Sequence, residues 1–83
     1  MSKGKLKKNE VEVLKENPYV KNVTENRIIY TDEFKSFFMN EYLKGEKPTK
    51  IFTAAGFDSR ILGPKRIERA AARWRMAYKE GKI

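Results

Sequence analysis

The sequence predicts a single, mostly α-helical domain with a small β-hairpin near its N-terminus. Three observations lead to this fold class. Apolar residues recur at helical spacing over residues 31–45 and 64–81. Pro and Gly residues mark the starts and ends of these segments. Residues 19–30 are instead rich in strand-forming types, which favours two short strands.

Length and composition limit the chain to one small domain. It has 83 residues, of which 40% are hydrophobic, so it can bury a modest core. It contains no Cys and no His, which removes disulfides, thiolate metal sites and the commonest general base. No apolar run approaches membrane-spanning length, and no apolar signal core follows the basic N-terminus. We therefore expect a cytoplasmic protein with no metal and no cofactor.

The N-terminal third of the chain is expected to hold a tail, a helix and a hairpin. Residues 1–8 carry four lysines, and we expect them to form a flexible basic tail. A short helix is predicted over residues 9–17, with Asn9 as its cap. Residues 19–30 then form the hairpin, whose turn lies at "TEN". A hairpin of this size needs a helix to pack against.

Residues 31–45 carry the clearest helical pattern. Thr31 is the expected N-cap, and two acidic residues follow it at the positive end of the helix dipole. Gly45 ends the helix. One face of the helix bears a stripe of aromatic rings, which we assign to the core. These rings belong to Phe34, Phe37, Phe38 and Tyr42.

Two short segments join this aromatic helix to the last helix of the chain. "KPTKIFTAAGF" predicts a helix that starts at Pro48 and ends at Gly56. "DSRILG" follows as a turn or a single helical turn, capped by either Asp58 or Ser59. Both segments are too short to form a second domain.

The last helix is predicted from Pro64 to about Lys79, with Gly81 after its end. At about 100° per residue its apolar side chains share one face, which we expect to be buried. They are Ile67, Ala71, Trp74 and Tyr78, flanked by Ala70 and Ala77. The opposite face is basic and has no acid, because Glu68 turns to a flank. It consists of Lys65, Arg66, Arg69 and Arg73.

Positive charge is concentrated in the second half of the chain. Of the net charge of +8, residues 46–83 contribute +6, from ten basic and four acidic residues. Such an asymmetry indicates an anionic partner. Arginine can grip phosphate or read guanine, and a helix in the major groove reaches bases with its first residues. We predict double-stranded DNA as the partner; the competing interpretation is an ordinary solvated face.

The order of elements is that of a helix-turn-helix. The run "YTDEFKSFFMNEYLKGEKPTKIFTAAGF…KRIERAAARWRMAYKEG" resembles the small homeodomain-like, first-frame proteins of bacterial insertion-sequence transposases. The opening "YTDEFK", the helix end "YLKG" and the close "WRMAYKEG" carry the resemblance, which covers residues 30–81. The first thirty residues have no counterpart in it. It implies a helix-turn-helix over residues 31–81 and a DNA-binding domain of residues 9–83.

The resemblance implies that the last helix reads the major groove at the ends of a mobile element. It assigns DNA contacts to Lys65, Arg66, Arg69 and Arg73, and more loosely to Ser59 and Arg60. From charge alone we add phosphate contacts by Lys47, Lys50 and the tail lysines Lys3, Lys5, Lys7 and Lys8. The sequence departs from the family pattern at "RILGP", which leaves either residues 59–62 or residues 64–73 as the segment in the groove. We favour residues 64–73, which hold the basic cluster.

We expect no catalytic residue in this chain. Its paired carboxylates are Asp32 with Glu33, which a helix start explains, and Asp58 with Glu68, which are far apart and bordered by arginines. In transposition, a separate catalytic transposase subunit would supply the metal-binding carboxylates. A homodimer would raise the limited specificity of one small module. The setting would be the nucleoid of a bacterial cytoplasm.

The sequence is also compatible with other functions. A small transcription regulator would use the same DNA-binding face. RNA binding would also use the charge, but single-stranded RNA readers usually expose aromatic rings that look buried in this chain. A protein-interaction adaptor would dock on an acidic partner or a transposase subunit, and would use Phe38, Met39 and Leu43 if the aromatic stripe is wider than the core needs. A membrane surface fits less well, because the apolar face of the last helix is mostly alanine.

Overall fold

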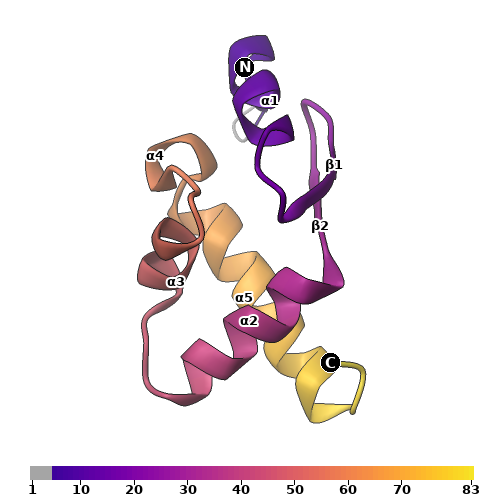
Figure 1. Cartoon of the computed structure of the whole chain (residues 1–83), viewed down its shortest axis with the longest axis vertical. Helices are drawn as coiled ribbons and strands as arrows, with labels where there is room; N and C mark the ends of the chain where they lie inside the picture. Colours follow the sequence, from indigo (N-terminus) through magenta and orange to yellow (C-terminus); the bar gives the residue numbers. More distant parts are fainter. Residues whose placement is uncertain (1–4) are drawn as a thin grey trace.

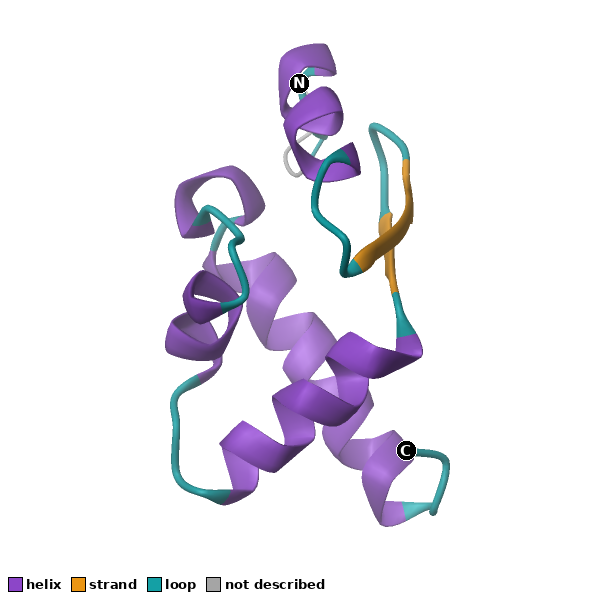
Figure 2. Ribbon diagram, in the orientation of Figure 1, coloured by secondary structure: helices purple, strands orange, loops and turns teal. Residues whose placement is uncertain are grey.

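The computed structural model describes residues 5–83, which form five helices and a two-stranded sheet. In chain order the elements are α1 (Lys8–Lys15), β1 (Val20–Val23), β2 (Ile28–Tyr30), α2 (Asp32–Leu43), α3 (Pro48–Ala54), α4 (Ser59–Leu62) and α5 (Pro64–Lys79). Figure 1 shows α2 crossing α5, with α3 and α4 beside the upper part of α5 and the hairpin with α1 above. The mostly helical class with an N-terminal hairpin is confirmed (Figure 2).

The hairpin turn lies where the sequence predicted it. The two strands pair antiparallel, with Tyr30 opposite Val20. The backbone N–H of Thr24 donates to the carbonyl of Arg27 (2.9 Å). The hydroxyl of Thr24 accepts the N–H groups of Asn26 and Arg27, each at 3.3 Å. Because Thr24 satisfies these turn donors itself, the turn is fixed by local hydrogen bonds.

The segment before α1 packs against the hairpin, which the sequence did not predict. Leu6 is buried in the hydrophobic core. Its N–H donates to the carbonyl of Glu25 in the hairpin turn (2.7 Å). Residues 1–4 of the expected tail lie outside the described residues. Because Leu6 is buried and bonded to Glu25, residues 5–7 lie against the domain beside the hairpin turn.

The cap of α1 differs from the prediction. The N–H of Lys7 donates to the carboxylate of Glu10 (2.8 Å), and α1 begins immediately after Lys7. Asn9 is therefore inside the first turn and not the cap, and the predicted range 9–17 is displaced. Glu10 determines the start of the helix because a carboxylate three residues after the cap can accept its otherwise unsatisfied N–H.

Aromatic rings from four elements form the centre of the core. The indole of Trp74 on α5 stacks on Phe52 of α3, with 5.8 Å between ring centroids. It meets Phe38 of α2 and Tyr30 of β2 edge-on, both at 5.1 Å. Such stacked and edge-on pairs are favourable beyond simple burial. These contacts attach the hairpin to the helix-turn-helix, so both belong to one packed unit.

The caps and the aromatic stripe of α2 follow the prediction. The hydroxyl of Thr31 accepts the N–H of Phe34 (3.2 Å). Phe34 and Phe38 are fully buried, and Phe37 and Tyr42 pack at the margin of the core. The stripe therefore faces α3 and α5 along most of its length.

The predicted adaptor surface on α2 does not exist as we described it. Phe38 is 0% exposed and Met39 is 3% exposed, whereas Leu43 is 57% exposed. Phe38 and Met39 turn inward because the core needs the full width of the aromatic face of α2. Leu43 alone does not provide an apolar docking surface.

The buried face of α5 is shorter than predicted. Ile67, Ala71 and Trp74 are buried, but Tyr78 is 44% exposed. Figure 1 shows the reason, because the C-terminal end of α5 extends beyond its crossing with α2. Each helix within residues 5–83 is too short or too polar to cross a membrane.

Candidate nucleic-acid interface

A glycine separates the basic helix from the turn before it. Gly63 has φ 80° and ψ 151°, a backbone conformation that side chains other than glycine rarely adopt. It ends α4 and caps α5, and Pro64 takes the first helical position, where no backbone donor is required. The two candidate reading segments, residues 59–62 and 64–73, are therefore separate helices.

The N-terminal half of α5 presents a basic face to solvent. Lys65, Arg69 and Arg73 are exposed, and Arg66 is half-buried beside them. Within residues 5–83, Lys65, Arg69 and Arg73 form no ion pair. Trp74 is 5% exposed on the opposite side. The predicted rotation of the helix is confirmed: the indole turns inward and three unneutralised cations project outward.

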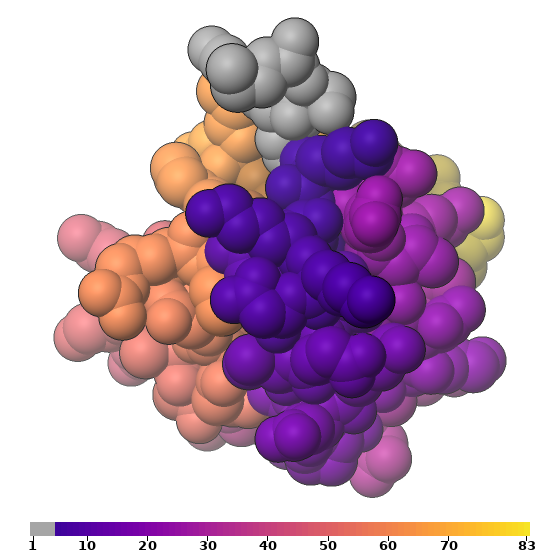
Figure 3. All heavy atoms as spheres, turned by 90° about the horizontal axis from the view of Figure 1, so that it is seen from above, coloured from indigo at the N-terminus to yellow at the C-terminus, as the bar shows by residue number. Residues whose placement is uncertain are grey.

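These cations line a groove whose second wall is built by the N-terminal third of the chain. Its volume is about 1100 Å³. The second wall, called here the N-terminal wall, consists of Lys5, Leu6, Lys7, Glu10, Asn26, Arg27 and Ile28. Figure 3 shows the indigo N-terminal segment beside the orange residues of α4 and early α5. The basic residues that line the groove are Lys5, Lys7, Arg27, Lys65, Arg66, Arg69 and Arg73.

Tyr30 reaches the groove from the core. It is 4% exposed, and its buried hydroxyl has no hydrogen-bond partner within the described residues. Burial raises the pKa of Tyr30 to about 12, against the opposing effect of the positive charges of Arg66 and Arg73. The phenol is therefore protonated at neutral pH and can donate a hydrogen bond.

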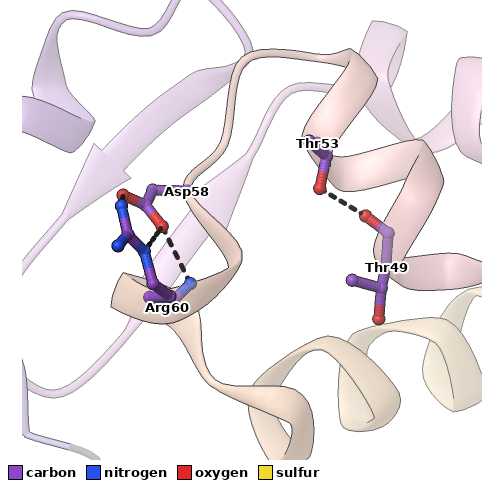
Figure 4. Close-up of polar contacts among 4 residues, drawn as sticks. All are labelled: Thr49, Thr53, Asp58 and Arg60. Carbon is purple, nitrogen blue, oxygen red and sulfur yellow. Dashed lines mark hydrogen bonds and ion pairs between the residues drawn. The ribbon is translucent and has the colours of Figure 1, made fainter.

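Asp58, one of the two candidate caps, is the cap of α4. Its carboxylate accepts the N–H of Arg60 (2.9 Å) and forms an ion pair with the Arg60 guanidinium (3.4 Å), as Figure 4 shows. In the same view the hydroxyl of Thr53 donates to the carbonyl of Thr49 within α3 (2.8 Å). The Asp58–Arg60 pair is on the surface, where such pairs hold side chains only weakly.

The Asp58 cap of α4 should make the free energy of unfolding depend on pH. The Arg60 N–H, and then the Arg60 side chain, hold the pKa of Asp58 below its ordinary value of 3.8. A carboxyl with a depressed folded-state pKa stabilises the fold above its unfolded pKa and loses that contribution as pH falls through the folded value. We expect Asp58→Asn, which keeps the cap, to remove this part of the acid sensitivity. The free energy of unfolding of both proteins is measured by urea unfolding between neutral pH and about pH 2. If it falls equally with decreasing pH in the two proteins, Asp58 does not contribute to the acid sensitivity.

The structure does not bring all the predicted site residues together. Lys47, the N-cap residue of α3, and Lys50 within α3 are exposed and lie outside the groove. Ser59 and Arg60 on α4 also do not line it, although Ile61 and Leu62 of the same helical turn do. Of the tail lysines, Lys5 and Lys7 line the groove, Lys8 starts α1, and Lys3 is outside the described residues.

The groove also contains residues that the sequence did not reveal. Asn26 and Arg27 come from the hairpin turn, and Tyr30 comes from β2. Arg27 was visible as a cation beside the "TEN" turn, but no local pattern connects it with α5. The position of Tyr30 depends on tertiary contacts alone.

The carboxylates of the chain are dispersed. Asp32 at the start of α2 forms an exposed ion pair with Lys35 (3.8 Å), and Glu33 follows it in the first helical turn. Within residues 5–83, no group of three or more His, Cys, Asp or Glu side chains is arranged to hold a metal ion.

The arrangement of α2, α3, α4 and α5, with a basic last helix, defines a helix-turn-helix domain. Residues 1–83 match the family of transposon-related helix-turn-helix domain proteins. The chain belongs to this family. Its membership supports DNA binding in a transposition context and suggests a non-catalytic role. The match also includes the first thirty residues, which had no counterpart in the resemblance seen in the sequence. No curated protein and no solved structure matches the chain significantly.

Proposed function

We propose that the protein binds duplex DNA through the basic face of α5, as the DNA-binding subunit of a transposition system. One observation carries this proposal. Lys65, Arg69 and Arg73 project from the face of α5 opposite the buried Trp74, and they form no ion pair within residues 5–83. Unneutralised cations on the first turns of a helix fit a helix that enters the major groove.

The proposed mechanism divides the contacts into two classes. Arg69 and Arg73, with Arg66, meet base edges, because a guanidinium can bond guanine with two parallel hydrogen bonds. Lys65 and the cations around the helix hold phosphates and fix the position of the protein on the duplex. Ser59 and Arg60 on α4 would add contacts at the turn, and Lys47 and Lys50 would contact phosphates farther along.

Duplex DNA is favoured over RNA by the burial of the aromatic rings. Among residues 5–83, the one exposed aromatic side chain is that of Tyr78. It lies at the C-terminal end of α5, whereas the basic cluster lies at the N-terminal end. Readers of single-stranded RNA stack bases on exposed rings. Here the basic face has no such ring beside it.

A selection experiment tests the proposal. Random duplex DNA and a random RNA pool are incubated with the protein in parallel, and the bound molecules are sequenced. We expect the duplex pool to yield an enriched sequence. The logarithm of its affinity should fall with the logarithm of salt concentration by about 0.9 per phosphate neutralised. Enrichment from the RNA pool alone, or affinity independent of salt, would count against the proposal.

Two partners follow from the same proposal. DNA cleavage in transposition would require carboxylates from a separate catalytic subunit, because this chain contributes a binding face. A homodimer on a two-fold symmetric site would raise specificity above that of a single module. A selected sequence with two inverted half-sites would support the dimer.

A further inference from the structure

We propose that the groove between α5 and the N-terminal wall holds the sugar-phosphate backbone of one strand of the bound duplex. In this arrangement α5 faces the bases, and the N-terminal wall grips the bordering strand from the other side. The inference rests on the proposed function and deepens it, since it gives the first thirty residues a direct part in DNA binding.

The groove is large enough for one strand and too small for a whole duplex. Its volume of about 1100 Å³ is at the upper end of the range for small-molecule pockets, about 300–1,000 Å³. The domain itself measures 34 × 26 × 21 Å. A duplex, whose major groove alone is about 12 Å wide, cannot lie inside a groove of such a domain. One strand bordering the major groove can enter it.

The charge of the groove fits a polyanion. Seven basic residues line it, and they come from both walls. Among the described lining residues the one acid is Glu10, whose carboxylate is already bound to the N–H of Lys7 in the cap of α1. In this arrangement Lys65 on the α5 wall and the three cations of the N-terminal wall contact phosphates of one strand from two sides, and the arginines of α5 contact base edges.

The described residues that line the groove offer no exposed aromatic ring on which bases could stack. Among the described residues that line it, the aromatic one is Tyr30, and its ring is packed in the core against Trp74 (5.1 Å between ring centroids). Proteins that hold single strands by their bases use exposed rings. The lining therefore favours a strand held by its backbone while its bases remain paired.

Tyr30 supplies a second, independent indication of a ligand. Tyr30 is one of the residues that line the groove, its buried hydroxyl has no hydrogen-bond partner among residues 5–83, and the positive charges of Arg66 and Arg73 act on it. An unsatisfied buried hydroxyl is unfavourable, and a phosphate oxygen is a strong acceptor. A phosphate of the strand held in the groove would accept this hydrogen bond from Tyr30, while Arg66 and Arg73 keep their proposed contacts with base edges.

The first test compares two double variants with equal loss of charge. Lys7→Gln with Arg27→Gln alters the N-terminal wall, whereas Lys21→Gln with Lys79→Gln alters exposed residues outside the groove. Affinity for the selected duplex is measured over a range of salt concentrations. The wall variant should lower the salt slope by about 0.9 for each lost phosphate contact, and the control variant should leave it unchanged. Equal slopes for the two variants would overturn the inference.

The second test removes only the hydroxyl of Tyr30. Tyr30→Phe keeps the ring contacts, so the free energy of unfolding should not fall. Duplex affinity should drop about ten-fold, because a hydrogen bond to a charged acceptor is lost. Unchanged affinity in a folded Tyr30→Phe protein would overturn the phosphate position, and tighter binding of single-stranded than of duplex DNA would overturn the whole arrangement.

A third variant separates this inference from the proposed function. Arg69→Gln removes a cation from α5 itself. Weaker binding by Arg69→Gln together with unaltered binding by the wall variant would leave the proposed function standing and overturn the groove. If neither variant changes duplex affinity, the proposed function itself fails.

Discussion

Replacing Trp74 by alanine should lower the free energy of unfolding by about 3–5 kcal/mol. The indole is 5% exposed and lies 5.1–5.8 Å, between ring centroids, from four other rings. They belong to Tyr30, Phe34, Phe38 and Phe52. A core this small cannot refill the cavity, because its remaining rings are held in place by α2, α3 and β2. A domain of this size has only about 5–15 kcal/mol of stability in total, so the variant should be partly unfolded.

Urea unfolding followed by circular dichroism measures this effect, since the variant lacks the only tryptophan of the chain. Tyr78→Ala is the matched control. It removes an aromatic ring from the same helix, but Tyr78 is 44% exposed, and surface substitutions usually change stability by only about 0.5 kcal/mol. Equal losses for the two variants would contradict the packing of α5, and with it the direction in which its arginines point.

Local signals explain why much of the fold could be predicted from the sequence. The Thr31 cap, the Pro64 start and the apolar spacing around Trp74 each act within a few residues, so the sequence carries them directly. The last helix was therefore predicted with the correct rotation. Tyr78 was misplaced because helical spacing shows which residues share a face, whereas burial depends on where α2 stops covering that face.

The start of α1 illustrates a different limit. Asn9 is a good cap by type, but Lys7 takes the position because Glu10 accepts its N–H. The preceding residue, Leu6, is buried and bonded to Glu25 of the hairpin turn. A tertiary contact thus places the segment, and a residue-type preference worth about 1 kcal/mol does not overrule it.

The groove could not be predicted from any local pattern. It forms because residues 5–7 and the hairpin turn come to lie opposite the first half of α5. The sequence showed cations in all three places, but charge alone does not place them around one cavity. The sequence therefore predicted one wall of the candidate site, the basic face of α5, but not the N-terminal wall opposite it.

Replacing Arg69 should weaken DNA binding and reduce its sequence preference. Arg69 is exposed on the basic face, lines the groove and forms no ion pair within residues 5–83. If it bonds a base edge, Arg69→Ala should cost about 1–3 kcal/mol of binding free energy and relax the preference at one base position. Titration of the selected duplex and of duplexes substituted at each position measures both effects.

Arg75→Ala is the control for this experiment, because Arg75 has the same charge on the same helix. Its guanidinium donates to the hydroxyl of Tyr42 (3.2 Å) and lies 5.6 Å from the centre of the Tyr42 ring, outside the groove. Its loss should leave base preference intact. An equal loss of affinity for every duplex on replacing Arg69 would instead make Arg69 a phosphate contact.

Arg60→Ala decides which of the two helices reads the bases. Arg60 is on α4, before the Gly63 break, and is already paired with Asp58. If α5 enters the major groove, Arg60→Ala should weaken binding of all duplexes slightly and reduce the salt slope by about 0.9 at most. A relaxed preference at one base after Arg60→Ala, with none after Arg69→Ala, would move the reading segment from residues 64–73 to residues 59–62. In that case α4 would contact the bases, and the groove beside α5 would bind phosphates only.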